Sequence, residues 1–169
     1  GHIYGLGVSG YIGSTIEIES VAFKAKEKGR GVVRFNDTAG SMAKDSVFNA
    51  ASVIRKMTDK DISDYDIHVN IIGGGRIDGP SAGAAITVCI ISSLLNKPLK
   101  QNIAITGEIS LRGNIKPVGG IFEKTYGAKR NGIKTMVIPV ENLKEVPNDI
   151  EDIVVEPVSN IEELIKIVF

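Results

Sequence analysis

Residues 73–95 read GGGRIDGPSAGAAITVCIISSLL, and the predicted elements are arranged around them. Its first part is a glycine-rich loop. From Pro80 onward the residues are almost all small or apolar, which is typical of a central helix buried on every side. Proline suits the first helical turn because its missing N–H would have had no partner there. Ser81 is therefore predicted to lie where the loop becomes the helix, beside free backbone N–H groups and the positive end of the helix dipole.

A serine at the start of a helix has two interpretations. Its hydroxyl can be a nucleophile whose oxyanion is held by the free N–H groups, or it can cap the helix. Nucleotide binding at this loop is excluded, because Pro80 stands where the phosphate-binding lysine of a P-loop is required. Residues 5–10 spell G-x-G-x-x-G, but residues 13–19 then alternate like a strand instead of forming the helix that dinucleotide binding needs.

The composition limits the class of protein. At 169 residues the chain is predicted to form one domain, residues 1–169, large enough to bury a sizeable core. Twenty basic and twenty acidic residues cancel, so no global field attracts nucleic acid and we expect no nucleic-acid partner. Cys89 is the only cysteine, which is typical of a reducing compartment, and two histidines cannot form a three-histidine metal site. No apolar run is long enough to predict a membrane helix within these residues.

The first part of the chain alternates between polar and apolar residues and is predicted to form antiparallel strands and one helix. Strands are expected at residues 3–9, 15–25, 31–35 and 65–72. The second and third of these are expected to form a hairpin through the turn at residues 28–31. Apolar residues at helical spacing predict an amphipathic helix from Ser41 to about Thr58.

The chain after the central helix is predicted to form strand–helix–strand units. Strands are expected at residues 103–106, 134–138 and 153–155, a hairpin at 108–118, and helices at 121–130, 141–145 and 159–167. Ser159 and Glu162 have the spacing of a capping box at the start of the last helix. The predicted fold class is mixed α/β: antiparallel N-terminal strands followed by strand–helix–strand units around a buried central helix.

A nucleophilic Ser81 needs a base, and Lys124 is the candidate. Free lysine has a pKa near 10.4, so acting as a base at neutral pH requires burial that lowers the pKa by about 3 units. Lys124 follows the small and apolar residues 117–122 near the start of a predicted helix, and such surroundings favour a neutral amine. A solvated lysine on an exposed helix face is the alternative, and spacing alone does not decide between them.

Two motifs of this chain resemble those of a known protease family. Residues 78–83 (DGPSAG) look like the nucleophile motif of the Lon proteases. Residues 106–113 (TGEISLRG), followed by residues 118–124 (VGGIFEK), are similar to the segment that carries the catalytic lysine of that family. The separation of Ser81 and Lys124, 124 − 81 = 43 residues, also fits. The resemblance covers nearly the whole chain, and its richness in isoleucine and lysine would suit an archaeal member.

The resemblance implies a serine endopeptidase with a Ser–Lys dyad. Ser81 would attack the peptide carbonyl, and neutral Lys124 would take the proton and return it to the leaving amine. Backbone N–H groups at Gly79 and Ala82 would hold the oxyanion.

Three further residues match supporting positions of the family. Thr106 matches a threonine that hydrogen-bonds the lysine; a threonine that only ends a strand is the alternative. Asp78 matches an acidic residue whose ion pair with Lys124 would keep the amine protonated and latch the resting site; an Asx-type turn is the alternative. His68 matches a histidine on the adjacent strand, with either a supporting or a purely structural role.

The resemblance also implies partners outside this chain. Lon enzymes couple this domain to an AAA+ ATPase that unfolds protein substrates and threads them into a hexameric ring. ATP and Mg would bind in that part, so this excised domain is expected to need no cofactor or metal of its own. A cytoplasmic location is implied, with a membrane anchor in the parent protein of archaeal-type members. The alternative function is a non-catalytic module whose glycine loop and helix start bind a small anion.

Overall fold

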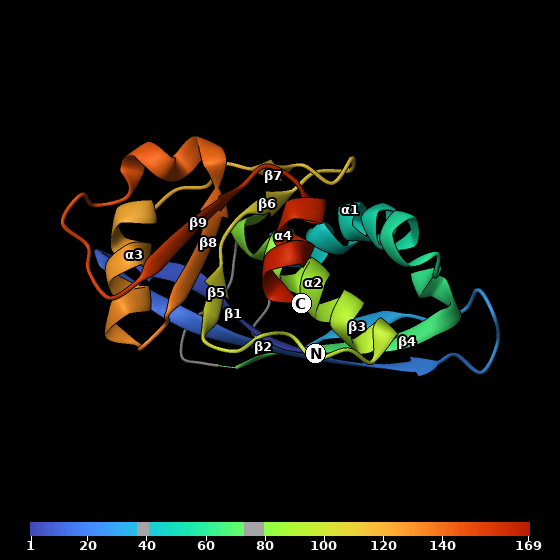
Figure 1. Ribbon diagram of the computed structural model, residues 1–169. Helices are drawn as coiled ribbons and strands as arrows, with labels where there is room; N and C mark the ends of the chain where they lie inside the picture. Colours follow the sequence, from blue (N-terminus) through green and yellow to red (C-terminus); the bar gives the residue numbers. More distant parts are fainter. Residues whose placement is uncertain (37–40, 73–79) are drawn as a thin grey trace.

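The computed structural model describes residues 1–36, 41–72 and 80–169. Its strands are β1 His2–Ser9, β2 Ile12–Lys24, β3 Val33–Phe35, β4 Tyr65–Ile72, β5 Ile103–Ile105, β6 Glu108–Ile109, β7 Ile115–Lys116, β8 Thr135–Pro139 and β9 Val154–Val158 (Figure 1). Its helices are α1 Ser41–Thr58, α2 Gly83–Leu95, α3 Ile121–Arg130 and α4 Ile161–Val168. Short 3₁₀ helices form at Ile62–Asp64, Pro80–Ala82 and Val140–Glu145.

Among the described residues, seven strands form one mixed sheet in the order β3-β4-β2-β1-β5-β8-β9. β2 runs antiparallel to both of its neighbours, β1 and β4. β1, β5, β8 and β9 run parallel to one another, and β6 pairs with β7 in a separate antiparallel hairpin. The carboxyl ends of the parallel strands therefore meet at one edge of the sheet, where open α/β sheets bind their ligands.

Helices cover both faces of this sheet. Ala104 and Ile105 are consecutive residues of β5 that belong to two different buried clusters, and consecutive strand residues point to opposite faces. Ile105 lies in the larger cluster, which includes buried apolar residues of α1, α2 and α4. Ala104 lies with Ile121 and Ala128 of α3. Figure 1 accordingly shows α3 apart from the other three helices.

The predicted central helix is confirmed as α2, which is buried at every residue from Gly83 to Ser92. Small residues permit this burial, since a Cβ on Gly83 would lie 3.0 Å from the Ile109 Cγ2 atom of β6. The helix ends at Asn96, whose left-handed backbone directs its N–H to the carbonyls of Ser92 and Ser93. The fold class is thus the predicted mixed α/β arrangement around a buried helix.

The predicted hairpin between the second and third strands is wrong. β4 lies between β2 and β3, and it pairs antiparallel with β2 and parallel with β3. β4, with its alternating buried residues, is the second strand from the edge of the sheet. β3 is short and forms the edge itself. Gly31 approaches β4 so closely that a Cβ there would lie 2.0 Å from the carbonyl oxygen of Tyr65.

The predicted cap of the last helix is displaced by one residue. The N-cap of α4 is Asn160, whose side chain accepts a hydrogen bond from the Glu163 N–H at 2.9 Å. Ser159 instead accepts a hydrogen bond from the N–H of Ile115 through its backbone carbonyl, which ties the start of α4 to β7. Serine and asparagine are both favoured at N-caps, and the contact with β7 places Ser159 one residue before the cap.

Candidate active site

Ser81 lies in the 3₁₀ turn Pro80–Ala82 that leads into α2, and its side chain is half-buried. The N-cap of α2 is Ala82, and no side chain caps the helix. Within the described residues the Ser81 hydroxyl makes no hydrogen bond. The interpretation of Ser81 as a helix cap is therefore wrong.

The segment that holds Ser81 is tied to the end of β5 through Gly107. The N–H of Gly107 donates to the carbonyl of Ser81 at 2.9 Å, and the N–H of Ala84 donates to the carbonyl of Gly107 at 3.0 Å. Because a Cβ on Gly107 would lie 2.7 Å from the Ile115 side chain, only glycine fits this position without displacing its neighbour. The turn before α2 is therefore fixed to the carboxyl edge of the parallel strands.

Lys124 reaches the same edge from α3 on the opposite face of the sheet. Its side chain is 4 % exposed, and Nζ donates to Thr106 Oγ1 at 3.0 Å. Burial lowers the pKa of Lys124 from 10.5 to about 8, because removal from water disfavours the charged amine. The predicted contact between Thr106 and the lysine is thus present, and the alternative of a solvated lysine is wrong.

Thr106 and Gly107 together form the junction of the site. Thr106 binds the Lys124 amine, and the next residue, Gly107, binds the Ser81 backbone. Thr106 is itself held by β8, since its N–H donates to the carbonyl of Val137 at 3.0 Å. Two segments that are distant in sequence are thereby anchored to adjacent residues.

Two glycines that sequence reasoning did not select set the position of α3. A Cβ on Gly13 of β2 would lie 1.9 Å from the Glu123 carbonyl oxygen, and a Cβ on Gly127 would lie 2.4 Å from the Gly13 backbone. The Arg130 side chain also donates to the Gly13 carbonyl at 2.6 Å. Lys124 thus sits on a helix in direct backbone contact with β2. An isolated glycine inside a strand or helix pattern is the signal that could have identified this contact.

The other predicted site residues are placed as follows. Ala82 is buried and is the N-cap residue of α2. Asp78 and Gly79 lie outside the described residues.

His68 is not brought to Lys124. It lies exposed on β4, with its ring edge-to-face against Phe23 at a centroid distance of 6.4 Å. The strand register aligns one row across the sheet, made of Ile72, Glu17, Tyr4 and Ala104. His68 precedes this row by four residues, about 13 Å along the strand, and two strands separate it from β5.

A hollow lies beside Ser81 on the side of α1. Its volume is about 190 Å³, and it is lined by Asp45, Ser46, Asn49, Pro80, Glu108 and Ile109. Pro80 is the neighbour of Ser81 in the chain, so the hollow is adjacent to the serine.

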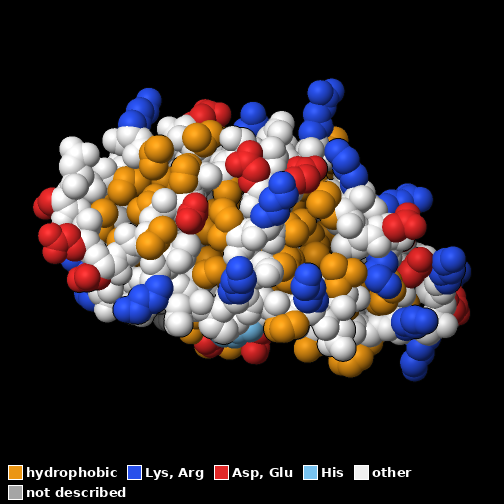
Figure 2. All heavy atoms as spheres, viewed as in Figure 1, with side chains coloured by type: hydrophobic (Ala, Val, Ile, Leu, Met, Phe, Trp, Pro, Cys, Tyr) orange, Lys and Arg blue, Asp and Glu red, His pale blue; other side chains and the backbone are white. Residues whose placement is uncertain are grey.

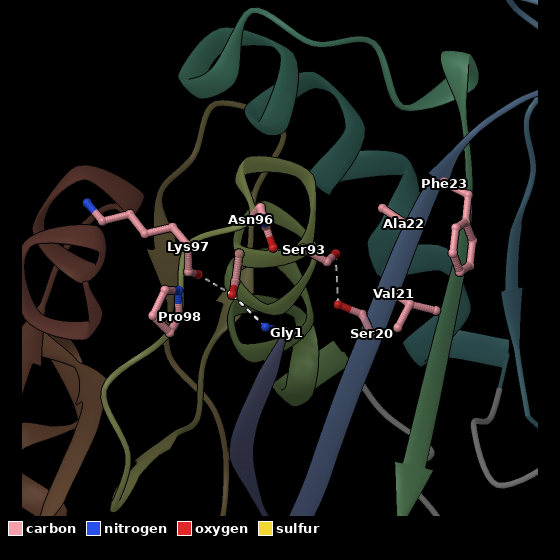
Figure 3. A pocket seen from close by; sticks show the side chains of 10 residues that line it. Gly1, Ser20, Val21, Ala22, Phe23, Ser93, Asn96, Lys97 and Pro98 are labelled. Atoms are coloured by element: carbon pink, nitrogen blue, oxygen red, sulfur yellow. Dashed lines mark hydrogen bonds between the residues drawn. The ribbon is translucent and has the colours of Figure 1, made fainter.

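A larger hollow of about 390 Å³ lies at the other end of α2, between that end and β2 (Figure 3). Its serines are already engaged: Ser20 donates to the Cys89 carbonyl at 2.8 Å, and Ser92 donates to the Lys97 carbonyl at 2.6 Å. The Lys97 side chain points away from the hollow and stacks over the Phe169 ring. All three serine hydroxyls of this hollow therefore have hydrogen-bond partners, unlike that of Ser81 within the described residues.

The surface shows no segregation of charge on the face drawn in Figure 2, where acidic and basic side chains are interspersed. Within residues 1–36, 41–72 and 80–169, no group of three His, Cys, Asp or Glu side chains is suited to hold a metal ion. None of the helices in these same ranges is both long enough and apolar enough to cross a membrane.

Comparison with known proteins identifies relatives of the whole chain. Residues 1–169 match the Lon protease (S16) C-terminal proteolytic domain. The chain is 40% identical over 178 aligned residues to a Lon protease of Buchnera aphidicola, with 99% of this chain and 22% of that protein covered. It is 39% identical over 178 residues to Lon protease 2 of Bacillus subtilis, with 98% and 32% covered. A Lon protease of Rickettsia bellii is 34% identical over 177 residues, with 98% and 22% covered.

The chain thus spans about a fifth to a third of the length of these relatives. The match to the family extends over the full sequence, including the segments that hold Ser81, Thr106 and Lys124. The predicted resemblance is therefore confirmed. The chain belongs to the Lon protease (S16) C-terminal proteolytic domain family and is a serine peptidase domain.

Proposed function

We propose that this domain cleaves peptide bonds of unfolded proteins with Ser81 as the nucleophile and Lys124 as the general base. The observation that carries the proposal is the junction at residues 106–107. Thr106 holds the buried amine of Lys124, and Gly107 holds the backbone of Ser81. A base needs a pKa near the working pH, and burial brings the pKa of Lys124 to about 8.

The chemistry begins when the Ser81 oxygen adds to the peptide carbonyl carbon and Lys124 Nζ accepts the hydroxyl proton. Backbone N–H groups at Gly79 and Ala82 hold the oxyanion that forms. Collapse breaks the C–N bond, and Lys124 returns the proton to the leaving amine. A water molecule then attacks the acyl-serine while Lys124 takes a proton from it. The acyl C–Oγ bond breaks, Lys124 gives that proton to Ser81 Oγ, and the product carboxylate is released.

Asp78 has a separate proposed role. It restrains the resting site through an ion pair with Lys124, because a nearby carboxylate keeps the amine charged and unable to accept the serine proton.

The relatives are several times longer than this chain, which supports a proposal about the parent protein. It couples this domain to an AAA+ ATPase part, which binds ATP and Mg and delivers unfolded chains. The parent is a homo-hexamer of archaeal type in the cytoplasm, with any membrane anchor outside this domain. The proteolytic domain itself uses no cofactor or metal and binds no nucleic acid.

The test replaces Ser81 with Ala and measures cleavage of an unfolded protein together with covalent labelling by a serine-reactive peptide probe. We expect Ser81→Ala to lose both signals while its thermal unfolding stays close to that of the wild type, because the hydroxyl makes no hydrogen bond within the described residues. The control is Ser52→Ala, which changes an exposed serine of α1 and should retain both signals. Wild-type cleavage by Ser81→Ala would exclude Ser81 as the nucleophile and favour a non-catalytic module.

A further inference from the structure

Asn142 is a buried side chain that makes two hydrogen bonds to the backbone of one residue. It lies in the 3₁₀ helix Val140–Glu145, directly after β8, and is 3 % exposed. Its Oδ1 accepts from the N–H of Val118 at 2.9 Å, and its Nδ2 donates to the carbonyl of Val118 at 2.9 Å. Nδ2 also donates to a carboxylate oxygen of Glu145 at 2.5 Å. The amide therefore holds both polar groups of one backbone residue, as a neighbouring strand would.

Val118 stands at the entrance to the lysine helix. Gly119 and Gly120 follow it, and the first residue of α3 is Ile121. The N-cap is Gly120, which has a left-handed backbone and no side chain to cap the helix. The N–H of Lys124 donates to the carbonyl of Gly120 at 2.8 Å. The Lys124 N–H is therefore bonded to a residue only two positions after Val118, the residue that Asn142 holds.

Those two glycines cannot by themselves fix the direction of the helix. Gly119 has open space around its Cα, and glycine is the most conformationally permissive residue. Gly120 is confined on one side, where a Cβ would lie 2.7 Å from Val8. The hydrogen bonds from Asn142 therefore hold Val118, which directly precedes the two glycines.

The same corner of the fold also holds the partner of the lysine. Thr106 is bound through its N–H to Val137 of β8, and Asn142 follows the end of that strand. One strand end thus anchors both Thr106 and the entrance to α3. Lys124 Nζ and Thr106 Oγ1 thus belong to segments that are held at the same strand end.

We propose that Asn142 is a positioning residue for the peptidase reaction: by clamping Val118 it fixes the first turn of α3 and holds the Lys124 amine, buried, on Thr106. This inference rests on the proposed function of Lys124 as the base. Asn142 acts through Lys124 and does not touch the substrate.

The experiment compares Asn142→Ala and Asn142→Asp with Asn148→Ala, which changes an exposed asparagine of the following segment. The first readout is the pKa of the Lys124 amine, measured by NMR in the Ser81→Ala background, where no turnover is needed. The second is kcat and KM against pH with Ser81 intact. Far-UV and near-UV circular dichroism verify that each variant is folded.

We expect Asn142→Ala to raise the pKa of Lys124 from about 8 toward 10.5 by at least about half a unit, because a loosened amine gains water. Its kcat should fall by about tenfold or more with KM nearly unchanged, since small displacements of a reacting group are costly. Asn142→Asp keeps the acceptor for the Val118 N–H but sets a carboxylate against the Val118 carbonyl and the Glu145 carboxylate, so its effect should be at least as large. Asn148→Ala should match the wild type.

The inference is overturned if folded Asn142→Ala keeps the wild-type pKa of Lys124 and the wild-type kcat. It is also overturned if neither Asn142 variant folds, because Asn142 would then hold the whole fold and not the lysine. If the pKa shifts but Ser81→Ala still cleaves, the positioning role stands and the proposed function fails. If Ser81→Ala is inactive and the Asn142 variants are normal, only the positioning role fails.

Discussion

At the scale of single residues, burying the Lys124 amine has an energetic cost. A charged amine that is almost fully buried loses most of its hydration, and its hydrogen bond to Thr106 replaces only part of it. The cost falls on the charged form, which is why burial lowers the pKa. The same environment that disfavours the ammonium ion makes the neutral amine available as a base.

Replacing Lys124 with Arg tests whether the residue acts by losing a proton. Arginine is not deprotonated in proteins, so Lys124→Arg should be as inactive as Lys124→Ala. The measurement is single-turnover cleavage of a peptide, with Lys129→Arg on the exposed face of the same helix as the control. Retained activity in Lys124→Arg would mean that the position supplies only a positive charge.

The pH dependence of cleavage follows from the lowered pKa. Only the neutral amine accepts the serine proton, so kcat/KM should rise with pH through a midpoint near the Lys124 pKa of about 8. A profile measured from pH 6 to about 10 on a peptide without titrating groups checks this expectation. A midpoint far below 7 would point to another base.

Sequence motifs identify the candidate chemical residues more readily than the residues that position them. The motifs around Ser81 and Lys124 are contiguous, so they can be recognised without knowing what lies across the fold. Gly13 and Asn142 act through partners more than 20 residues away, on Glu123 and Val118. No local pattern names those partners, because only the assembled sheet brings them together.

At the scale of elements, the contact between α3 and β2 determines where the lysine lies. A Cβ on Gly13 would overlap the Glu123 carbonyl at 1.9 Å, and that backbone atom cannot rotate away. We therefore expect Gly13→Ala to lift α3, to lower stability by about 1–3 kcal/mol and to reduce kcat by about tenfold or more.

The matched control for this substitution is Gly119→Ala. A Cβ on Gly119 would have no neighbour within 4 Å, so an alanine there meets no obstacle. Thermal unfolding and single-turnover rates of both variants provide the comparison. Equal behaviour of Gly13→Ala and the wild type would show that α3 is not seated on β2 in the way described.

Periodicity predicted the elements well, and their pairing less well. The predicted range of α3 agrees with the structure, and so does that of β4, because both have clear apolar periods and clear end signals. The pairing of β2 with β3 was predicted wrongly because chain proximity favours a hairpin. The strand that separates them, β4, comes more than 25 residues after β3 in the chain. β4 has three buried residues and β3 has none, which is consistent with β4 taking the inner position.

At the scale of the whole molecule, the buried lysine links stability to pH. In the unfolded chain Lys124 keeps its proton up to about 10.5, and in the folded chain up to about 8. Between these values the unfolded state binds more protons, so the free energy of unfolding rises with pH. Below pH 8 the full destabilising effect of the buried Lys124 is present. The difference of the two pKa values corresponds to about 3 kcal/mol.

Lys124→Met should therefore be inactive but more stable than the wild type at pH 7. The gain is reduced by the lost hydrogen bond to Thr106, which leaves a net stabilisation of about 1–2 kcal/mol. Urea unfolding at pH 7 and near pH 10.5 measures it, and the gain should shrink at the higher pH. Lys129→Met, at an exposed position of α3, should show no such gain.

The adjacency of Thr106 and Gly107 has a mechanical consequence. Thermal motion that displaces the end of β5 moves both anchors together, so the lysine and the serine segment travel as a pair and their separation is preserved. Slow motions of the sheet as a whole therefore leave the separation of Lys124 and the Ser81 segment unchanged. Only differential motion, in which α3 or the turn before α2 shifts alone, changes the distance that the proton must cross.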